Sequence, residues 1–462
     1  MTTYNPVTET FLAQLRDIVG VDGVSTAESE RNLHAADMSS HPPHLCDAVV
    51  WPTTGAQVAA VLRLANAHGV PVTPWGVGSS LEGNPIPLYG GISLSTERMQ
   101  GIVAVHADDF QVTVQPGIGY KDLNKKLAAY GLFFPPDPGA NATIGGMLAN
   151  NASGIRTVKY GASKDNVLRM EVALADGRLI HVGSRSIKQS SGYDLLHLFI
   201  GSEGTLGVIT EATLKLTPIP ALMSAVVASF VDVETAVTAV VAIKGTGLDL
   251  AALDFIDGST AAMLTQENGV DIPAQPTLLM EFHATHAETI ELGLEMVREI
   301  CVEMGATRIQ ATADPTERQR IWHARHQTYE TKLRLNPGIS WMPMDVAVPI
   351  TAYPALVVFA EQEMAAKGVS GFLIGHAGDG NMHFTLAYQD KESHERAKEV
   401  NTAVIRRAVD LGGTATGEHG VGIGKAPLMP YEHGLALDVM RQIKQTLDPN
   451  SILNPGKIFP KL

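Results

Sequence analysis

Two short stretches near the C-terminal end of the chain carry the residue types best suited to chemistry. They are GHAGDGNMH at residues 375–383 and GEHG at residues 417–420. Together they offer His376, His383 and Glu418 as metal ligands, with His419 immediately beside the third. Two imidazoles and one carboxylate leave coordination positions open, as a catalytic metal requires. Zinc, manganese and iron suit such a ligand set about equally.

The spacing of the two histidines is a weak signal by itself. Residues seven apart on one strand point to opposite faces of a sheet. Residues 377–381, AGDGN, contain a strong turn signal, and a turn there would fold His376 and His383 back toward each other. Asn381 could then orient a ligand from outside the metal shell. Histidines on an exposed hairpin loop are the alternative, which spacing alone does not exclude.

A glycine-rich loop, GVGSSLEG at residues 76–83, follows the predicted strand VPVTPW. Backbone N–H groups and two hydroxyls in such a place suit a pyrophosphate, although an ordinary strand–loop connection gives the same pattern. The sequence contains no GxxxxGK[ST] and no HExxH. An ATP phosphate loop and a helical zinc-peptidase site are therefore excluded.

The bulk properties of the chain exclude several classes of protein. A chain of 462 residues is too long for one hydrophobic core, so two or three domains are expected. The net charge of −14, with no run of Lys or Arg longer than two, argues against nucleic acid as a partner. An acidic surface suits docking to a basic electron carrier, but it is also common among enzymes. Cys46 and Cys301 are interpreted as reduced core residues of an intracellular protein.

No segment of the sequence carries an export or organelle signal, and none reaches the ~20 apolar residues that span a bilayer. No transmembrane segment is therefore expected. The sequence favours a cytoplasmic location and leaves open a peripheral association with the inner face of the membrane.

The pattern of helices and strands that must position these residues changes along the chain. A helix over residues 8–20, capped by Thr8, begins the chain, and a loose polar segment follows it. Residues 92–217 are mostly short strands, with a hairpin turn at Asp176–Gly177. Beyond a boundary at Pro218–Pro220, strands alternate with long helices. The clearest helices are predicted at 287–304 and 391–411.

Several long motifs resemble the vanillyl-alcohol-oxidase type of FAD domain. They are PWGVGSSLE (74–82), PPDPG (135–139), TIGGMLANNASG (143–154), Tyr160–Gly161 and FIGSEGTLGVIT (199–210). The C-terminal motifs at 375–383 and 417–420, with NPGK at 454–457, resemble the partner domain of D-2-hydroxyacid dehydrogenases. That group includes D-lactate dehydrogenase (cytochrome), D-2-hydroxyglutarate dehydrogenase and the glycolate oxidase large subunit. The resemblance covers residues from about 45 to 460.

The resemblance implies an α+β fold with four segments. An N-terminal helical segment (1–44) would precede a two-subdomain FAD-binding domain (45–218). An α+β substrate, or cap, domain would follow and carry the metal ligands (219–415). A C-terminal segment with helices would return to the FAD domain (416–462).

The resemblance also implies FAD, held non-covalently. Some relatives attach the flavin through a histidine in the first glycine-rich loop, where this sequence has Ser79 and Ser80. The implied FAD-binding residues are Trp75, Gly76, Gly78, Ser79, Ser80, Leu81, Pro135, Asp137, Thr143, Gly145, Gly146, Asn150, Ser153, Gly154, Tyr160, Gly161, Glu203, Gly207, Ile209 and Asn454.

The same resemblance assigns roles to the C-terminal motifs. It places a divalent metal at His376, His383 and Glu418, and makes His419 the catalytic base. Hydride would pass from the substrate carbon to flavin N5, and then electrons to a cytochrome, a quinone or an electron-transfer flavoprotein. A homodimer is left open.

Three further residues are assigned to the substrate by the resemblance. Arg325 would bind the substrate carboxylate, for which a planar guanidinium is suited. On sequence alone, an arginine on a helix, such as Arg325, more often belongs to a solvated face or an ion pair. Thr385 and Asn381 would also contact substrate.

One departure from the family pattern bears on the substrate. Hydroxyglutarate dehydrogenases carry a lysine shortly before the position of Asp345, whereas residues 335–344, LNPGISWMPM, contain no cation. This favours D-lactate or a larger monocarboxylate. D-2-hydroxyglutarate remains the alternative, because Lys332 or Arg334 could still reach the substrate.

Two other functions fit the sequence less well. A flavin-binding subunit of a glycolate oxidase-type complex without its own turnover would not need His376, His383, Glu418 and His419 together. A flavin-dependent transferase that makes ether-lipid precursors would need a basic phosphate-binding cluster, of which the sequence shows no sign.

Overall fold

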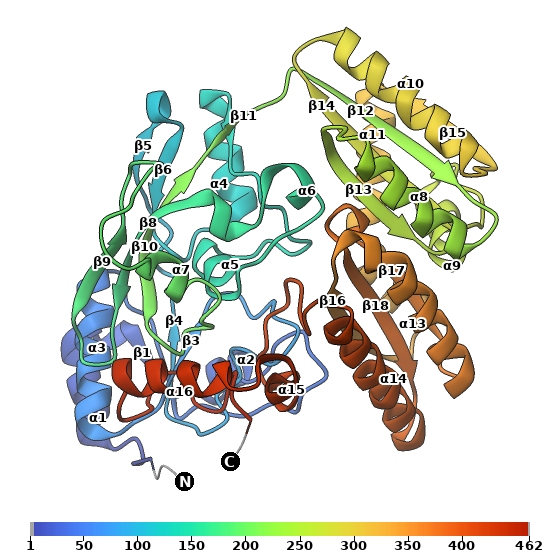
Figure 1. The fold of residues 1–462 in the computed structure, drawn as a ribbon. Coiled ribbons are helices and arrows are strands. Elements are labelled where there is room, and N and C mark those ends of the chain that lie inside the picture. Colours follow the sequence, from blue (N-terminus) through green and yellow to red (C-terminus); the bar gives the residue numbers. More distant parts are fainter. Residues whose placement is uncertain (1–3, 461–462) are drawn as a thin grey trace. The chain divides into compact units, whose positions relative to one another are not determined.

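The chain forms two units, and the second is inserted into the sequence of the first (Figure 1). The computed structural model describes residues 4–460. The first unit runs to Ser153, resumes at Ala162–Ile219 and is completed from Glu418 onward. The second unit comprises Gly154–Gly161 and Pro220–Gly417. The four-segment division predicted from the sequence stays a prediction.

The first unit begins with a four-stranded sheet in the order β1-β2-β4-β3. Strands β2 and β3 both pair in parallel with β4, while β1 pairs antiparallel with β2. The strands are β1 (Val24–Ser25), β2 (Ala48–Val50), β3 (Val72–Trp75) and β4 (Ile92–Ser95). Helices α1 (Glu9–Val19) and α3 (Gly55–His68) pack with this sheet in one core. The hydroxyl of Thr8 caps α1 and that of Thr54 caps α3, as the sequence predicts.

A second sheet in this unit is antiparallel, in the order β5-β6-β10-β8-β9. Its strands are β5 (Ile102–His106), β6 (Gln111–Val114), β8 (Val167–Ala173), β9 (Leu179–Gly183) and β10 (Val208–Lys215). The predicted hairpin turn at Asp176–Gly177 joins β8 to β9, with Gly177 at φ +82°. Beside this sheet lie the short pair β7 (Leu132–Phe133) and β11 (Thr217–Pro218), and the helices α4 (Tyr120–Leu127), α5 (Ile144–Asn150) and α7 (Leu195–Phe199).

The end of the chain completes the first unit. Helices α15 (Met429–His433) and α16 (Ala436–Leu447) precede a tail that runs along β3. The Val72 N–H donates to the carbonyl of Ile452 at 2.8 Å, and the Asn454 N–H donates to the carbonyl of Val72 at 2.8 Å. The tail thereby covers the edge of the four-stranded sheet.

The second unit is built on a seven-stranded sheet in the order β15-β12-β14-β13-β17-β18-β16, in which all neighbours are antiparallel. Its strands are β12 (Leu222–Ser229), β13 (Leu250–Ile256), β14 (Thr277–Ala284), β15 (Arg308–Thr312), β16 (Ser340–Ala347), β17 (Gly371–Gly375) and β18 (Asn381–Tyr388).

Two groups of helices accompany this sheet. One group packs together as α8 (Val233–Gly245), α10 (Ala287–Glu303), α13 (Tyr353–Lys367) and α14 (Lys391–Asp410). The other is α9 (Gly258–Asn268), α11 (Pro315–His326) and α12 (Thr328–Leu335), joined by the short α6 (Thr157–Tyr160) beside β13. Trp322 and Ile321 of α11 share a buried cluster with Ile256 of β13 and Leu264 of α9. This second group carries side chains to the candidate site.

Both units combine helices with sheets, which confirms the predicted α+β fold. The predicted helices at 8–20, 287–304 and 391–411 are also confirmed. The loose polar segment after residue 20 was predicted wrongly, because it contains β1 and the helix α2 (Glu28–Leu33). Helix α2 has six residues and none of them is buried, so it lacks the apolar stripe that signals a helix in a sequence.

Two simpler expectations can be compared with the structure. Cys46 and Cys301 are both buried and free, as predicted. Among residues 4–460, no helix combines the length and the apolar composition that crossing a bilayer requires.

Candidate functional site

The hairpin of β17 and β18 brings the two candidate histidine ligands together. A 3-10 turn at Ala377–Asp379 connects the strands, and Ile374 pairs with His383. Gly380 adopts φ +69°, and a Cβ there would lie 2.1 Å from the carbonyl oxygen of Val348. The turn therefore depends on glycine. The rings of His376 and His383 lie 4.9 Å apart between centroids, so the turn predicted from AGDGN does fold them toward each other.

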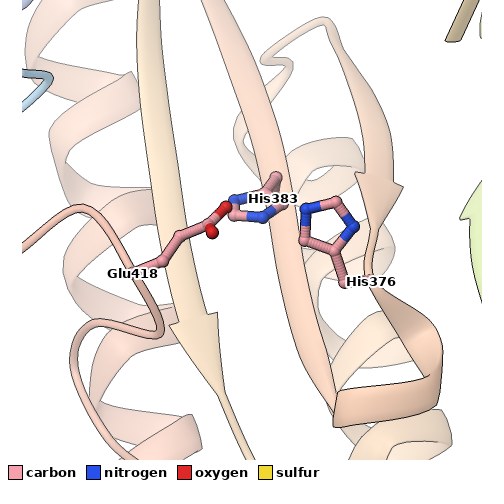
Figure 2. Close-up of side chains that lie close together, drawn as sticks. All are labelled: His376, His383 and Glu418. Atoms are coloured by element: carbon pink, nitrogen blue, oxygen red, sulfur yellow. The ribbon is translucent and has the colours of Figure 1, made fainter. Parts of the chain in front are cut away.

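Glu418 lies beside these two histidines. It directly follows Gly417, the last residue of the second unit, so chain continuity carries it to the hairpin. One candidate ligand atom from each of His376, His383 and Glu418 falls within 4.8 Å of the others. Figure 2 shows the Glu418 carboxylate next to the His383 ring, with the His376 ring beyond it. Both histidines are buried, which excludes the exposed-loop alternative.

A buried carboxylate on β13 orients His376. The Nδ1 atom of His376 lies 2.9 Å from Oδ1 of Asp254, and Nη2 of Arg325 lies 2.8 Å from Oδ2 of the same residue. Burial acts to raise the pKa of the Asp254 carboxyl, but Arg325 and His376 outweigh it and the net pKa is lowered. An ionised Asp254 keeps a proton on Nδ1 of His376. The Nε2 lone pair is then the one suited to a metal.

A second buried carboxylate lies behind His383. Oδ1 of Asp345 is 3.5 Å from Nδ1 of His383 and accepts a hydrogen bond from Nδ2 of Asn381 at 2.7 Å. Oδ2 of Asp345 accepts from the Thr416 hydroxyl at 2.8 Å. A Cβ at Gly417 would lie 2.1 Å from Nδ2 of Asn381, so the first glycine of GEHG makes room for that amide.

These residues fit a divalent metal ion. Two imidazoles and a carboxylate, with further carboxylates behind the imidazoles, form a donor set typical of catalytic metal sites. The buried Oδ1 atom of Asn381 also has no hydrogen-bond partner within the described residues, so a ligand at this place could satisfy it.

Arg325 is buried on α11, so it does not lie on a solvated helix face, but it does form the ion pair that the sequence alone left open. Its guanidinium is held by the ion pair with Asp254, and its Nε atom has no hydrogen-bond partner among residues 4–460. A buried donor without a partner is available to an incoming carboxylate. The predicted substrate-binding role of Arg325 stays a prediction.

Thr385 lies on β18, two residues beyond His383 and on the same face of the sheet. It is buried and accepts a hydrogen bond from Nζ of Lys332, on α12. Arg334, the other cation that the sequence offered for a distal carboxylate, is instead largely exposed and paired with Glu267 at 2.9 Å.

In the first unit, the predicted pyrophosphate loop follows β3 directly. A Cβ at Gly76 would lie 2.6 Å from the Thr143 hydroxyl, and Gly78 adopts φ +68°. Thr143 in turn caps α5, where its hydroxyl accepts from the Gly146 N–H at 3.3 Å. The Thr143 side chain at the start of α5 thus lies against the backbone of Gly76, where there is no room for a Cβ. A backbone cradle of this kind fits a pyrophosphate.

Glu203 joins three segments that the resemblance assigned to FAD. It is buried at φ +53°, and its carboxylate accepts from the backbone N–H groups of Val421 at 2.6 Å and Gly422 at 2.9 Å. Nδ2 of Asn84 donates to it at 2.6 Å, and Nδ2 of Asn454 donates to the Glu203 carbonyl at 2.7 Å. Burial is the largest influence on the pKa of Glu203 and raises it. Segments 76–84, 203–209 and 454–457 therefore meet at one place, which we call the Glu203 hub.

The other predicted FAD-binding residues are divided between the two units. Asn150 donates to the His419 carbonyl at 3.4 Å, and the Ser153 hydroxyl donates to Glu418 at 2.7 Å. The first unit also contains Trp75, Ser79, Ser80, Leu81, Pro135, Asp137, Gly145, Gly207 and Ile209. Gly154, Tyr160 and Gly161 instead belong to the second unit. Their predicted contact with flavin stays a prediction.

Tyr160 takes part in a polar chain within the second unit. Its hydroxyl lies 2.6 Å from Nδ1 of His283, whose Nε2 bonds to Glu281. Arg156 also donates to Glu281, at 3.3 Å. This chain fixes the segment 154–161 on β14.

Sequence reasoning missed Asp254, which is fully buried, and named Lys332 only as a cation that could reach the substrate. Asp254 interrupts the strand LAALDFI, all of whose residues are buried. A lone carboxylate in an apolar strand must have a partner, and this signal was available in the sequence.

Two family models match the chain. The model described as FAD linked oxidases, C-terminal domain, matches residues 219–458, which is more than half of the chain. The model described as FAD binding domain matches residues 46–183.

Several relatives match over nearly the full length. A probable D-lactate dehydrogenase, mitochondrial, from Danio rerio is 38% identical over 98% of this chain and 92% of its own. The glycolate oxidase subunit GlcD from Bacillus subtilis is 34% identical over 98% of both chains. The D-lactate dehydrogenase [cytochrome], mitochondrial, from Arabidopsis thaliana is 36% identical over 99% of this chain and 81% of its own.

Solved structures match in fold alone. p-Cresol methylhydroxylase with substrate bound gives a TM-score of 0.79 at 17% identity, over 98% of this chain and 97% of that one. An alkyldihydroxyacetonephosphate synthase gives 0.76 at 19% identity, over 98% of this chain and 86% of that one. Both agree with the predicted type of FAD-binding fold.

Proposed function

The chain belongs to the family of FAD-linked oxidases, and we propose that it oxidises a D-2-hydroxy acid to the 2-oxo acid with the help of a divalent metal. Its membership makes it an FAD-dependent oxidoreductase acting on a hydroxy acid. The observation that supports the metal is the cluster of His376, His383 and Glu418, with Asp254 behind the first histidine.

The residues at the cluster have separate tasks in this proposal. A divalent ion at such ligands supplies polarisation of a substrate oxygen, and FAD supplies a hydride acceptor. His419 takes the proton of the substrate hydroxyl as a general base. Asp254 holds His376 in the tautomer that offers Nε2.

Arg325 orients the substrate through its carboxylate. Asp254 fixes the guanidinium on one side, and the unpartnered Nε can donate to the acid. The Asp254 carboxylate holds both Arg325 and His376. In this proposal the substrate carboxylate and the substrate hydroxyl are therefore bound at a fixed distance from each other.

The finer parts of the proposal rest on the relatives. Electrons would pass to a cytochrome, as the name of the Arabidopsis relative states for that protein, or to a quinone or an electron-transfer flavoprotein. D-lactate is the simplest substrate to test. A cytoplasmic location, peripheral membrane association and a homodimer all remain compatible with the proposal.

A flavin-binding subunit of a glycolate oxidase-type complex is the second candidate. The match to the GlcD subunit over 98% of both chains supports it. If the chain only supported a partner's chemistry, His419→Ala would leave the activity of the complex unchanged.

The decisive experiment is anaerobic mixing of the FAD-loaded protein with D- and L-2-hydroxy acids. D-lactate should bleach the oxidised flavin band, L-lactate should act far more slowly, and chelation followed by metal addition should abolish and restore the rate. His419→Ala should lower the rate of flavin reduction by about 10²–10⁴-fold. The matched control is His197→Ala, because His197 is half-exposed and bonded to Asp194 at the surface. No bleaching by any 2-hydroxy acid with metal present would refute the proposal.

A further inference from the structure

Lys332 is a buried cation that the proposed chemistry does not use. It lies on α12 with 1% of its surface exposed. Its Nζ donates to the hydroxyl of Thr385, which is its one hydrogen-bond partner in the described chain. No carboxylate of residues 4–460 lies within 4 Å of that nitrogen to form an ion pair. An ammonium has three donors, so two of them are unused.

The surroundings of Lys332 supply little compensating negative charge. The charged and titratable groups that face it are Asp257, Arg325 and Tyr329. Both carboxylate oxygens of Asp257 already accept backbone N–H groups, from Thr260 at 2.7 Å and Leu373 at 2.9 Å. Arg325 carries the same sign of charge as Lys332. Burial therefore dominates and lowers the pKa of Lys332 to about 7.

Aromatic rings wall the ammonium on several sides. Nζ of Lys332 lies 4.6 Å from the ring centroid of Phe372, 5.5 Å from that of Trp341 and 6.0 Å from that of Tyr329. The indole Nε1 of Trp341 is itself buried and has no hydrogen-bond partner among the residues described. Each unsatisfied buried donor destabilises the fold, because it has lost its bond to water without gaining another. Lys332 and Trp341 together thus leave donors that an anionic acceptor would satisfy.

The position along the sheet relates this cluster to the candidate metal ligands. His383 and Thr385 are successive residues on one face of β18, about 7 Å apart. Phe372 pairs with Thr385 across β17, and Trp341 pairs with Ala387 across β16, so both rings lie on that same face. The spacing is longer than that between a hydroxyl and the carboxylate on the same carbon. A substrate whose hydroxyl lies at His383 would therefore reach Lys332 with the far end of its side chain.

We propose that Lys332, Thr385 and Trp341 form a subsite for a second anionic group on the substrate, so that the chain prefers a 2-hydroxydicarboxylate to D-lactate. The inference rests on the proposed function and names its substrate class. It opposes the expectation from the sequence, which found no cation in residues 335–344. Lys332 stands just before that stretch, and the fold of α12 brings it to β18.

The test compares Lys332→Met with Arg334→Met in the FAD- and metal-loaded protein. Methionine keeps the length and apolar stem of Lys332 without its charge, and Arg334 is a largely exposed cation two residues away. We expect Lys332→Met to lower the ratio of kcat/KM for D-2-hydroxyglutarate to that for D-lactate by tenfold or more. Arg334→Met should leave the ratio unchanged. A smaller fall in Lys332→Met, or an equal fall in the control, overturns the subsite.

A pH profile gives a readout that a merely structural lysine would not move. Because the ammonium is lost as the pH rises through about 7, the KM for D-2-hydroxyglutarate should rise between pH 7 and 9 in the unmodified protein. Lys332→Met should show no such rise beyond that seen with D-lactate. A KM that rises equally in both proteins contradicts the assignment.

A binding measurement separates the subsite from the proposed function. Glutarate has both carboxylates but no hydroxyl to oxidise, so its affinity can be measured calorimetrically without turnover. We expect Lys332→Met to weaken glutarate binding by tenfold or more, and Arg334→Met to have no effect. If no hydroxy acid reduces the flavin but this difference is found, the proposed function fails while the anion subsite stands. Equal affinities would remove the subsite, whatever the turnover.

Discussion

A buried lysine in one unit of the molecule has different partners from a buried lysine in the other. Lys457 in the first unit and Lys332 in the second are both fully buried, and burial is the largest influence that lowers the pKa of each to about 7. Lys457 donates to the carbonyl of Ile86 at 2.6 Å and to Oδ1 of Asn454 at 3.3 Å, beside the Glu203 hub. Within residues 4–460, Lys332 donates to the hydroxyl of Thr385 alone.

The difference teaches that a shifted pKa does not by itself identify a functional lysine. Burial costs both ammonium groups a similar desolvation free energy. The acceptors of Lys457 are groups of the protein itself, whereas the further acceptors that Lys332 lacks must come from a ligand. We therefore interpret Lys457 as a structural tie between the tail and the first unit. Lys332 is interpreted as part of a binding site.

The largest test of this comparison is stability. Lys457→Met should destabilise the first unit by about 2–4 kcal/mol, because it orphans a buried carbonyl and an amide oxygen and removes a cation near Glu203. Lys332→Met should be neutral or stabilising, because it removes a poorly compensated charge. Thermal unfolding followed by FAD release measures both variants. Equal losses from both would break the comparison.

The pH dependence of stability gives a second test of the interpretation of Lys332. The pKa of Lys332 in the folded state, about 7, lies below the ordinary lysine value of 10.5, so between these values the unfolded chain binds more protons. The contribution of Lys332 to the free energy of unfolding therefore rises with pH between 7 and 10.5. Below pH 7 its destabilising effect is fully present. We expect the unmodified protein to gain about 2 kcal/mol more than Lys332→Met between pH 7 and 9. Urea titrations at both pH values measure this, and identical gains would contradict it.

A change at the buried carboxylate of Asp254 tests whether His376, His383 and Glu418 bind a metal. Asp254→Asn keeps the shape but weakens the hold on His376 and Arg325, and should lower metal affinity about 10–100-fold. Metal content after dialysis against a chelator series measures the loss. Asp249→Asn, at the exposed partner of Lys159, is the matched control and should retain its metal. Full metal retention in Asp254→Asn would argue that Asp254 only balances Arg325.

The smallest expected effect concerns the hydrogen bonds that link Tyr160 to His283 and His283 to Glu281. Like those of Lys457, they are made within the protein. Tyr160→Phe removes the hydrogen bond to His283 and should cost the second unit about 1 kcal/mol. Limited proteolysis of the segment 154–161 measures the loosening. Tyr193→Phe, at a side chain that is 96% exposed, should have no effect. A large loss of hydroxy acid turnover in Tyr160→Phe without loosening would instead favour a role for its hydroxyl at the flavin.

Local patterns in the sequence predicted the elements but not their partners. The turn in AGDGN was predictable because glycine and aspartate fix local backbone geometry, and Gly380 does adopt positive φ. Thr8 and Thr54 were predictable as caps for the same reason. By contrast, Asp254 contacts Arg325 and also His376, which lies 122 residues further along the chain. Nothing in the local sequence of its strand specifies these two partners.

The sequence offered Lys332 and Arg334 alike as cations that could reach the substrate and could not distinguish between them. Their sequence neighbourhood, TYETKLRL, reads as an ordinary amphipathic helix, and only the packing of α12 shows which cation is buried and which is exposed. The family motif assigned Tyr160 to FAD, which stays a prediction. Its hydrogen bond to His283 within the second unit could not be predicted from the motif.

The inserted order of the two units has a consequence for synthesis on the ribosome. Strand β3 is an edge of its sheet until Ile452 and Asn454 bond to Val72. Between these segments the ribosome must translate the whole of Pro220–Gly417, which at about 5–20 residues per second takes on the order of 10–40 s. During that time the nascent first unit presents an unpaired strand edge, a known template for aggregation. We expect the growing chain to need protection by chaperones until its last residues emerge.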